Sequence, residues 1–527
     1  MLELDQFLTF FIFIILPWLL LLLINKIFFY HKKLSPSQLS SSHLPKSYPI
    51  IGCYLTFRKH RKQPLNWLSD VLQKSPTSTF VFRKPLGELQ IHTANPENVE
   101  HILKTQFAVY PKGSVFTSTL RDLLGNGIIN TDGHQWKFQR QVSSHEFNTK
   151  SLKKFVETVV DAELNGRLIP ILSEAAENGA VLDLQDILTR FAFDNICQIA
   201  FGYDPGFLSR SLPKSDFASA FDEAAAISTQ RFRTIFPASW KIKRILNIGS
   251  EKKLRKAVYE VREFARTVVR QKKKELEGQN QCSLSESDLD LLSRFLRSGH
   301  EDEQFVIDII ISFILAGRDT TSVALTWFFW LLSRNPRAEN EIMKEICAKN
   351  SSDCVPDERS AYEEMKDMVY THASLCESMR LHPPVPVDSK EAISDDVLPD
   401  GTEVKKGMRV VYHPYAMGRS EKLWGKDWQE FRPERWLERR TAGEEVQKWR
   451  FVPRDPYSYP VFQAGPRICL GKEMAFLQMK RVVSGVLSRF RLVPAVEDGF
   501  EPVLVPTLTA VMDGGLPVRI DERKMTV

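Results

Sequence analysis

The chain has 527 residues, with 71 Lys and Arg against 65 Asp and Glu and a formal net charge of +6. That length can bury a large core, and so mild a charge, without a basic tract interleaved with aromatic residues, argues against nucleic-acid binding. The seven cysteines are scattered and form no CxxC pair, which argues against a disulfide framework or a zinc site and favours a reducing compartment.

The N-terminus carries an uncharged apolar run, FLTFFIFIILPWLLLLLI, over residues 7–24. A membrane-spanning helix needs about 20 apolar residues, and the following NKIFFY extends the run to that length. Acidic residues precede the run and lysines follow it, so the positive-inside rule keeps the rest of the chain in the cytosol. The alternative is a cleaved signal peptide, whose apolar core is shorter and ends at a small-residue cleavage site. We therefore expect a single-pass anchor over residues 1–33.

Residues 34–52 are rich in Ser and Pro and predict a stiffened linker that leads to one large body over residues 53–527. Early in this body, STFVFRKPLGELQIHTANP has β-branched and aromatic residues around a Pro-Leu-Gly turn, which indicates a short β-rich region. Helical periodicity or length follows in three segments, residues 151–175, 250–276 and 305–333.

Later in the chain, MRVVYHPYA predicts a strand, and LVPTLTAVMDGGLPVRI predicts a hairpin that turns at residues 513–515. Helices that are segregated from a few small sheets predict a mainly α (α+β) fold.

The segment ISFILAGRDTTSVALTWFFWLL is apolar on most faces, so this helix is expected in the interior. A polar break at Arg318, Asp319, Thr320 and Thr321 interrupts it, and Gly317 lets the helix bend and leaves space beside it. Such a break is suited to binding a diatomic ligand and passing protons to it. The alternative is a solvent-facing Asp beside a Thr pair that loosens the helix.

The stretch FQAGPRICLG places Cys469 among glycines just ahead of a helical run. A lone cysteine is usually a small buried hydrophobe. Here Gly465 and Gly471 let the backbone turn and approach something flat, and Arg467 can pair with an anion. The start of a helix also favours a thiolate. Together these residues suggest a metal-bound thiolate with an anionic ligand nearby.

Three further stretches carry residues that can form polar contacts. SLCESMRLHPP places Glu377 and Arg380 on one helix face, a spacing that is usually a weak surface pair. FRPERW supplies Arg435, which could complete a network with them. DGHQWKFQR places Trp136 and Arg140 four residues apart, where an aromatic N–H and a guanidinium suit an anionic edge such as a propionate.

The set FQAGPRICLG, AGRDTT, ESMR, FRPERW and WKFQR, together with the N-terminal apolar run, resembles the cytochromes P-450 over nearly the whole chain. The stretches SHEFNTKSLKKFVETVVD, VIDIIISFILAGRDTTS and YPVFQAGPRICLGKEMAFLQMKRVV also resemble the plant fatty-acid ω-hydroxylases of family 94, subfamily A. The resemblance implies a helical bundle around haem b with small β-sheets.

In such a protein Cys469 would be the proximal thiolate ligand of the haem iron, and Glu377, Arg380 and Arg435 would form a structural network. Lys390 stands where many relatives have an arginine or a histidine that holds a propionate, and a lysine cannot make the same planar fork. The residues that the resemblance assigns to the cofactor are Trp136, Arg140, Ala316, Lys390, Phe462, Gly465, Arg467, Cys469 and Gly471.

The resemblance assigns proton delivery to Asp319 and Thr320. Relatives that rearrange hydroperoxides often lack this threonine, so Thr320 favours a monooxygenase that uses O2. Electrons would come from NADPH through the NADPH-cytochrome P-450 reductase, at the endoplasmic reticulum membrane with the catalytic domain in the cytosol. A basic docking face for that partner would consist of Lys137, Lys472, Lys480 and Arg481, although each can equally be an ordinary solvated cation.

The implied substrate is a medium- or long-chain fatty acid, taken from membrane lipid and presented end-on through a narrow channel. Arg121 and Lys112 are candidates for holding its carboxylate. An alternative is ω-oxidation of jasmonoyl-amino-acid conjugates, as in sister subfamilies. A non-catalytic haem sensor is a third hypothesis, which Asp319 and Thr320 disfavour. Candidate channel residues, each of which can equally be core, are Phe116, Leu120, Phe313, Ala316, Val385, Val387 and Leu508.

Overall fold

The computed structural model describes residues 45–48, 51–234, 237–278, 289–298, 302–350, 360–439 and 449–523. The expected anchor over residues 1–33, and all but a few residues of the expected linker over residues 34–52, lie outside these ranges. Within the described ranges, no helix has both the length and the apolar character that crossing a membrane requires.

A four-stranded sheet joins two early strands to two strands from much later in the chain. Its strand order is β1 (Thr79–Arg83), β2 (Leu89–Thr93), β7 (Arg409–Tyr412) and β4 (Asp388–Glu391). A tight turn at Pro85–Gly87 connects β1 to antiparallel β2, as the Pro-Leu-Gly sequence predicts. β2 pairs in parallel with β7, and β4 is antiparallel to β7. The expected β-rich region and the expected strand at MRVVYHPYA are therefore confirmed.

Most of the body is helical. The helices up to the centre of the chain are α3 (Tyr54–Lys59), α4 (Pro64–Lys74), α5 (Pro96–Glu100), α6 (Gly113–Leu124), α7 (Gly133–Ser144), α8 (Thr149–Lys154), α9 (Asp161–Glu163), α10 (Ile169–Asn178), α11 (Leu184–Phe201), α12 (Asp216–Arg233), α13 (Pro237–Leu246), α14 (Gly249–Gly278) and α15 (Leu291–Arg297). Those that follow are α16 (Glu303–Ile314), α17 (Thr320–Ser333), α18 (Pro336–Asn350), α19 (Ala361–Lys366), α20 (Val369–Leu381), α21 (Pro414–Met417), α22 (Glu421–Trp424) and α23 (Lys472–Leu487).

α16 and α17 form one long central helix, joined by a π-helical turn at Leu315–Asp319. The helix begins where the Asp302 side chain accepts a hydrogen bond from the backbone N–H of Gln304, at 2.9 Å. Most of its side chains are buried, as the continuous apolar sequence predicts. A Cβ at Gly317 would lie 2.5 Å from the Ile196 side chain, so only glycine lets α11 approach this closely.

Small sheets complete the fold. They are β10 (Phe490–Pro494) with β13 (Pro517–Glu522) and β3 (Leu182–Asp183), β11 (Leu504–Pro506) with β12 (Ala510–Met512), β5 (Asp396–Val397) with β6 (Glu403–Val404), and β8 (Leu437–Arg439) with β9 (Trp449–Phe451).

The expectation of a hairpin that turns at residues 513–515 is wrong. The hairpin is instead β11–β12, with Thr507 closing its turn by a 2.8 Å backbone bond to Thr509. The chain after the Asp-Gly-Gly turn leaves β12 and pairs, as β13, with β10 and β3. The Leu516 N–H donates to the Asp183 carboxylate at 2.9 Å at the start of that pairing.

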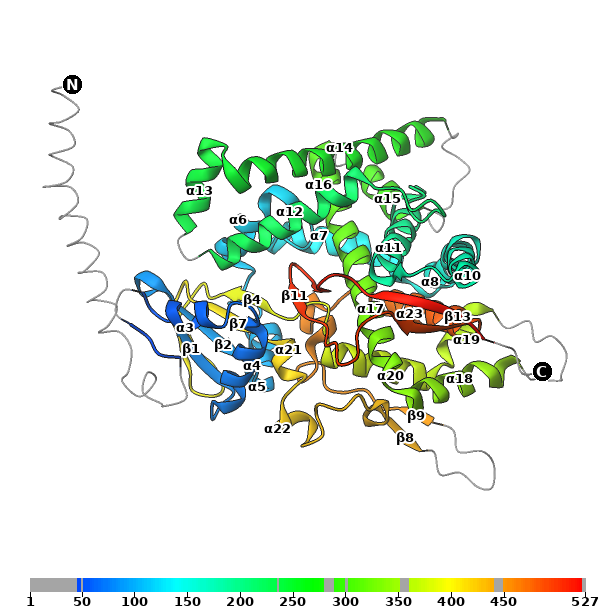
Figure 1. Cartoon of the computed structure of the whole chain (residues 1–527). Coiled ribbons are helices and arrows are strands. Elements are labelled where there is room, and N and C mark those ends of the chain that lie inside the picture. Colours follow the sequence, from blue (N-terminus) through cyan, green and yellow to red (C-terminus); the bar gives the residue numbers. More distant parts are fainter. Residues whose placement is uncertain are drawn as a thin grey trace, which may run out of the picture.

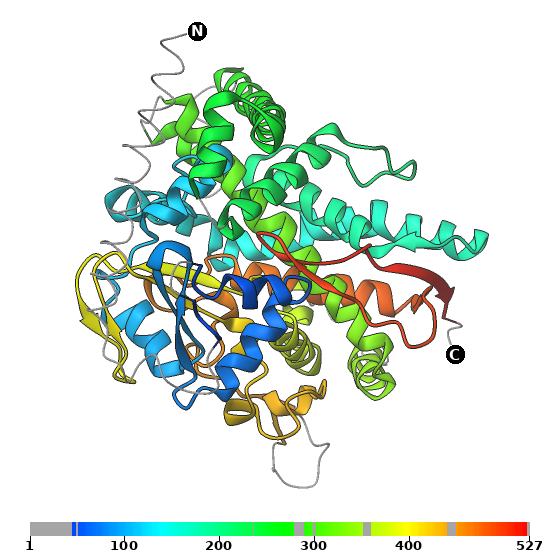
Figure 2. The same cartoon turned by 60° about the vertical axis from the view of Figure 1, so that its left-hand side comes forward.

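The four-stranded sheet lies on one side of the molecule and most helices lie on the other (Figure 1). In Figure 2, as in Figure 1, β1 and β2 stand away from β13, and the central helix passes between the two sides. A large apolar core surrounds α11, α16, α17 and α23, and a smaller one lies beneath the four-stranded sheet. The expected mainly helical fold with small sheets is confirmed.

Candidate functional site

Cys469 lies in a tight loop immediately before α23. Its backbone N–H donates to the Phe462 carbonyl at 2.8 Å, which closes the loop. Gly465 has a φ of 64° and sits so close to Leu103 that a Cβ would overlap its carbonyl oxygen, so this position requires glycine. Burial raises the pKa of the Cys469 thiol, while the Gly471 N–H and the nearby Arg140 and Lys472 oppose that rise.

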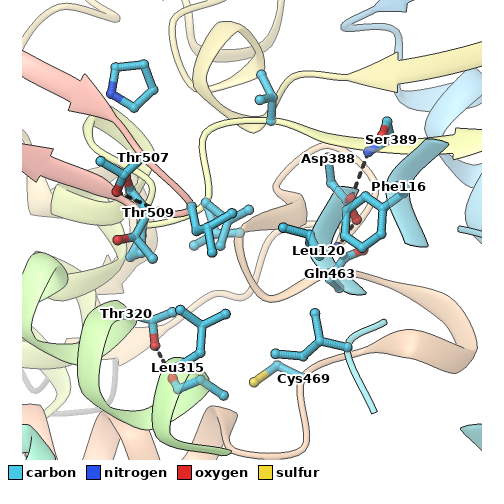
Figure 3. Close-up of a pocket in the computed structure, with 18 of the residues that line it drawn as sticks. Phe116, Leu120, Leu315, Thr320, Asp388, Ser389, Gln463, Cys469, Thr507 and Thr509 are labelled. Atoms are coloured by element: carbon cyan, nitrogen blue, oxygen red, sulfur yellow. Dashed lines mark hydrogen bonds between the residues drawn. The ribbon is translucent and has the colours of Figure 1, made fainter. Parts of the chain in front are cut away.

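Cys469 opens on to a cavity of about 630 Å³ that reaches from this loop to the four-stranded sheet. That volume is in the range of small-molecule sites. Figure 3 shows two residues on the wall of this cavity, Cys469 of the loop and Thr320 of the central helix. Asp388, Gln463 and Phe116 lie farther along the wall.

The apolar residues expected along a substrate channel do line this cavity. Its wall includes Phe116, Leu120, Phe313, Ala316, Val385, Val387 and Leu508. They come from α6, from the central helix, from the segment after α20 and from the β11–β12 turn, so the lining is assembled from distant parts of the chain. The same cavity wall contains Phe462, whose ring lies 5.2 Å from the ring of Phe476.

Trp136 and two arginines gather beside the Cys469 loop. Trp136 is buried, and the guanidinium carbons of Arg467 and Arg140 lie 4.5 and 5.8 Å from its ring centroid. Arg467 donates to the Asp132 carboxylate at 2.6 Å, and Arg140 donates to the Ile468 carbonyl at 2.8 Å. Burial lowers the pKa of both guanidinium groups, so this corner of the site favours an anion.

A buried polar cluster around Asp388 adjoins that corner. Lys112 Nζ lies 3.2 Å from the carboxylate, and Gln463 Nε2 donates to it at 2.6 Å. The Lys390 ammonium lies 3.7 Å from Asp388, but its Nζ has no hydrogen-bond partner in the described part of the chain. Burial lowers the pKa of Lys390 well below its usual value, and Lys112 adds to that effect. Lys390 itself does not line the cavity.

The polar break of the central helix is split between two environments. Thr320 lines the cavity, and its hydroxyl donates to the Ala316 carbonyl at 2.6 Å across the π-helical turn. Asp319 does not line the cavity, because its carboxylate pairs with Arg318 at 2.7 Å. Burial raises the pKa of Asp319 to about 6, although Arg318 opposes the rise. A carboxyl group with that pKa can exchange a proton near neutral pH.

The structure brings Glu377, Arg380 and Arg435 together below the site. Arg435 Nε donates to Glu377 at 3.2 Å, and the indole N–H of Trp436 donates to the same carboxylate at 2.9 Å. None of these side chains lines the cavity. The network joins α20 to the segment that precedes the Cys469 loop.

The cations expected to hold the substrate carboxylate or to form a docking face lie in different environments. Arg121 is exposed and does not line the cavity, whereas Lys112 does. Lys480 cannot belong to an exposed docking face, because it is buried and donates to the Met365 carbonyl at 2.8 Å. Lys137 is exposed, as a docking residue must be.

Sequence reasoning missed Asp388, Gln463 and Arg409, all of which line the cavity. Gln463 stands inside the Cys469 motif, so its position was a usable signal. Asp388 and Arg409 lie in short strands with no motif of their own, and only the pairing of β4 with β7 brings them to the site.

A sequence profile of the cytochrome P-450 family matches residues 43–513. The chain is 59% identical over 493 residues to Cytochrome P-450 94A2 of Vicia sativa, covering 94% of each protein. It is 59% identical over 481 residues to Cytochrome P-450 94A1 of Vicia sativa, covering 91% of each. To Cytochrome P-450 94B1 of Arabidopsis thaliana it is 48% identical over 498 residues, covering 94% of this chain and 95% of that one. The chain belongs to the cytochrome P-450 family, a class of haem-thiolate monooxygenases.

The family implies a haem whose iron takes a thiolate ligand, and the described residues fit such a group. The thiol of Cys469 faces a cavity large enough for a flat ring system. Beside it, Arg140 and Arg467 present cations, and the buried Lys390 Nζ lacks a hydrogen-bond partner. A carboxylate-bearing edge would supply the anion that this cationic corner favours.

Proposed function

We propose that this monooxygenase hydroxylates the terminal (ω) carbon of fatty acids, using O2 and electrons derived from NADPH. The observation that carries the proposal is the cavity itself. It runs from Cys469 past apolar side chains of α6 and the central helix, so it offers a long apolar path to a single reactive end. A terminal methyl reacts in preference to weaker internal C–H bonds only when the channel presents the chain end alone.

Haem b would be held by the Cys469 thiolate and would supply the oxygen-activating chemistry. In this assignment Trp136, Arg140 and Arg467, which line the cavity, would hold the propionates. Lys390, whose buried Nζ lacks a hydrogen-bond partner but does not line the cavity, would join them only by turning toward it. Phe462 packs near the sulfur, Gly465 and Gly471 shape the loop, and Ala316 leaves space beside the helix.

Thr320 and Asp319 have the proton-handling roles. The Thr320 hydroxyl lies on the cavity wall, and its hydrogen bond to the Ala316 carbonyl fixes its direction. Asp319 is the adjacent residue, and its pKa of about 6 lets it hold and release a proton near neutrality. Asp319 pairs with Arg318 and does not line the cavity, so in this proposal it acts as a proton reservoir behind Thr320.

The electron donor in this proposal is the membrane-bound NADPH-cytochrome P-450 reductase. The proposed location is the endoplasmic reticulum membrane, with residues 1–33 as the anchor and the catalytic body in the cytosol. Exposed Lys137 and partly exposed Lys472 can contribute to a basic docking face, because both lie near the Cys469 loop in sequence or space.

Product analysis by mass spectrometry tests the proposal. Membranes that contain the full chain and a plant reductase receive NADPH with a mixture of free fatty acids and jasmonoyl-isoleucine. We expect terminal hydroxy fatty acids, and none with Cys469→Ala. Turnover of the conjugate alone would assign ω-oxidation of jasmonoyl-amino-acid conjugates instead. No oxidised product at all, from enzyme whose haem spectrum is intact, would favour a non-catalytic haem sensor.

A further inference from the structure

The charged residues on the cavity wall are strongly unbalanced in sign. Asp388 is the acidic residue of the described lining. Opposite it stand six cationic residues, which are Lys84, Lys112, Arg140, Arg233, Arg409 and Arg467. A largely apolar cavity with this excess of positive charge is suited to ligands that carry a negative charge.

Most of these cations already have partners. Near Cys469, Arg140 and Arg467 bond to the Ile468 carbonyl and to Asp132. Lys112 pairs with Asp388 at 3.2 Å. Lys84 pairs with Glu88 at 3.0 Å, and Arg233 donates to the Pro506 carbonyl.

Arg409 differs from the other five. Its guanidinium forms no hydrogen bond or ion pair with any described residue, and its Nε is buried without a partner. The Phe232 ring lies 5.2 Å from its guanidinium carbon, which leaves the planar donor edge available. Burial lowers the pKa of Arg409, but an arginine stays charged in a protein. The acidic groups that act on it, Asp388, Glu88 and Glu391, are all outside ion-pair distance.

The surroundings of Arg409 suit a carboxylate. In the parallel register of β2 and β7, Gln90 lies directly opposite Arg409, and both line the cavity. His92, two residues along β2, also lines it and has an unpartnered, buried Nε2. Burial lowers the pKa of His92 well below its usual value, so the ring is neutral. The polar groups of β2 therefore add hydrogen-bonding capacity beside Arg409. On its other side, Glu391 of β4 lies opposite Arg409 in the antiparallel register, and that carboxylate instead accepts from the Ser114 hydroxyl at 3.1 Å.

Arg409 stands at the end of β7 away from the Cys469 loop. At the other end, the Tyr412 hydroxyl bonds to Gln463 of that loop at 2.5 Å. The strand alone separates the Cα atoms of Arg409 and Tyr412 by roughly 10 Å. An anion held at Arg409 is thus at the end of β7 opposite the end that meets the Cys469 loop.

We propose that Arg409 binds the carboxylate of the substrate and thereby fixes the chain with its opposite end toward Cys469. This rests on the proposed function and deepens it, because a single fixed anchor makes the terminal carbon the one that reaches the reacting group. The carboxylate can belong to a free fatty acid or to the amino-acid part of a conjugate. The planar fork of arginine holds either one through two parallel hydrogen bonds.

The test compares a carboxylic acid with its own methyl ester in the haem-loaded full chain. Substrate-induced spectral titration gives the dissociation constant of lauric acid, methyl laurate, jasmonoyl-isoleucine and its methyl ester. With Arg409→Gln we expect the acid to bind about 10- to 100-fold more weakly, with the ester unchanged. Arg409→Lys should recover part of the loss, because it keeps the charge without the fork. In turnover assays with the acid, the Arg409→Gln variant should have a higher KM than the wild type and should also hydroxylate subterminal carbons.

Lys406→Gln is the matched control, since it removes one exposed cation immediately before β7 and outside the cavity wall. The proposal would be overturned if Arg409→Gln had the wild-type ratio of acid affinity to ester affinity. It would also be overturned if Arg233→Gln, and not Arg409→Gln, weakened binding of the acid. The reduced-CO spectrum confirms that each variant is folded and loaded. The affinity ratio needs no turnover, so it is informative about Arg409 even if the product analysis rejects ω-hydroxylation. Loss of the acid alone or of the conjugate alone identifies which carboxylate is bound.

Discussion

Arg380 holds both oxygens of the Glu377 carboxylate, with Nε and Nη2 each donating at 2.8 Å, and both side chains are completely buried. The carboxylate also receives Arg435, so a single negative charge is shared by two buried cations. Such a group has no alternative solvent partner, which makes the pair sensitive to the removal of either charge.

Glu377→Gln should therefore destabilise the protein by about 3–5 kcal/mol, because the buried Arg380 loses its counter-charge and Arg435 keeps only Asp427. Urea unfolding at neutral pH measures the change, with loss of bound haem as a second signal. The control is Glu438→Gln, whose exposed pair with Arg450 should contribute below about 1 kcal/mol. Equal effects of the two substitutions would contradict the buried role of the network.

Cys469→Ala should abolish the reduced-CO spectrum of a thiolate-ligated haem, since its thiol is the one that faces the cavity beside the arginine corner. Cys347→Ala is the control, because that exposed cysteine lies on α18, outside the cavity wall. A thiolate spectrum that persists in Cys469→Ala would refute the ligand assignment.

Thr320→Ala should uncouple NADPH consumption from product, with the electrons recovered as peroxide, because the hydroxyl that faces the cavity is lost. Thr320→Ser keeps a hydroxyl at the same position and should stay close to wild-type coupling. Product and peroxide are measured per NADPH consumed. Indistinguishable coupling in Ala and Ser variants would argue against a proton-handling role.

A second buried ion cluster ties helices together above the cavity. Arg231 of α12 pairs with Glu251 of α14 at 2.5 Å and with Asp122 of α6 at 2.7 Å. Arg231→Met leaves Glu251 buried without its partner and should raise amide hydrogen exchange in α12 and α14. Adding Glu251→Met removes that stranded charge and should restore part of the protection. Additive loss in the double variant would show that the two residues act independently.

Glu146 gives the protein a pH-dependent stability. Burial raises its pKa from 4.5 to about 7, although Arg294 at 3.5 Å opposes the rise. The folded state thus binds a proton that the unfolded chain has released, so the free energy of unfolding from this group falls as pH rises from about 4.5 to about 7. Glu146→Gln should flatten that dependence by roughly 1–3 kcal/mol in urea unfolding at pH 5 and pH 8. A wild-type slope that survives the substitution would assign it to other groups.

The parts of the site that sequence could predict are those encoded within a few residues. The Cys469 loop, the polar break at Thr320 and the spacing of Glu377 with Arg380 each carry their geometry locally, through a turn or one helix face. The sequence does not predict where the Asp319 side chain points, because its pairing with Arg318 keeps it out of the cavity wall.

Arg409 could not be predicted, since its position depends on strand pairing between distant segments. MRVVYHPYA indicates a strand but not the neighbour that places Gln90 beside Arg409. For the same reason the Asp-Gly-Gly signal revealed a turn without revealing that the next strand, β13, joins β10. Lys480 likewise depends on which face of α23 meets α19, and its amphipathic pattern alone did not determine that.

The parallel pairing of β2 with β7 also affects how the protein folds while it is being synthesised. His92 and His413, hydrogen-bonded at 2.8 Å, are 321 residues apart in the sequence. During synthesis, β2 therefore has one open edge until most of the chain has left the ribosome, and an open edge is a template for pairing with another chain. Nascent molecules should depend on chaperones through that interval, and a message truncated before β7 would yield an aggregation-prone product.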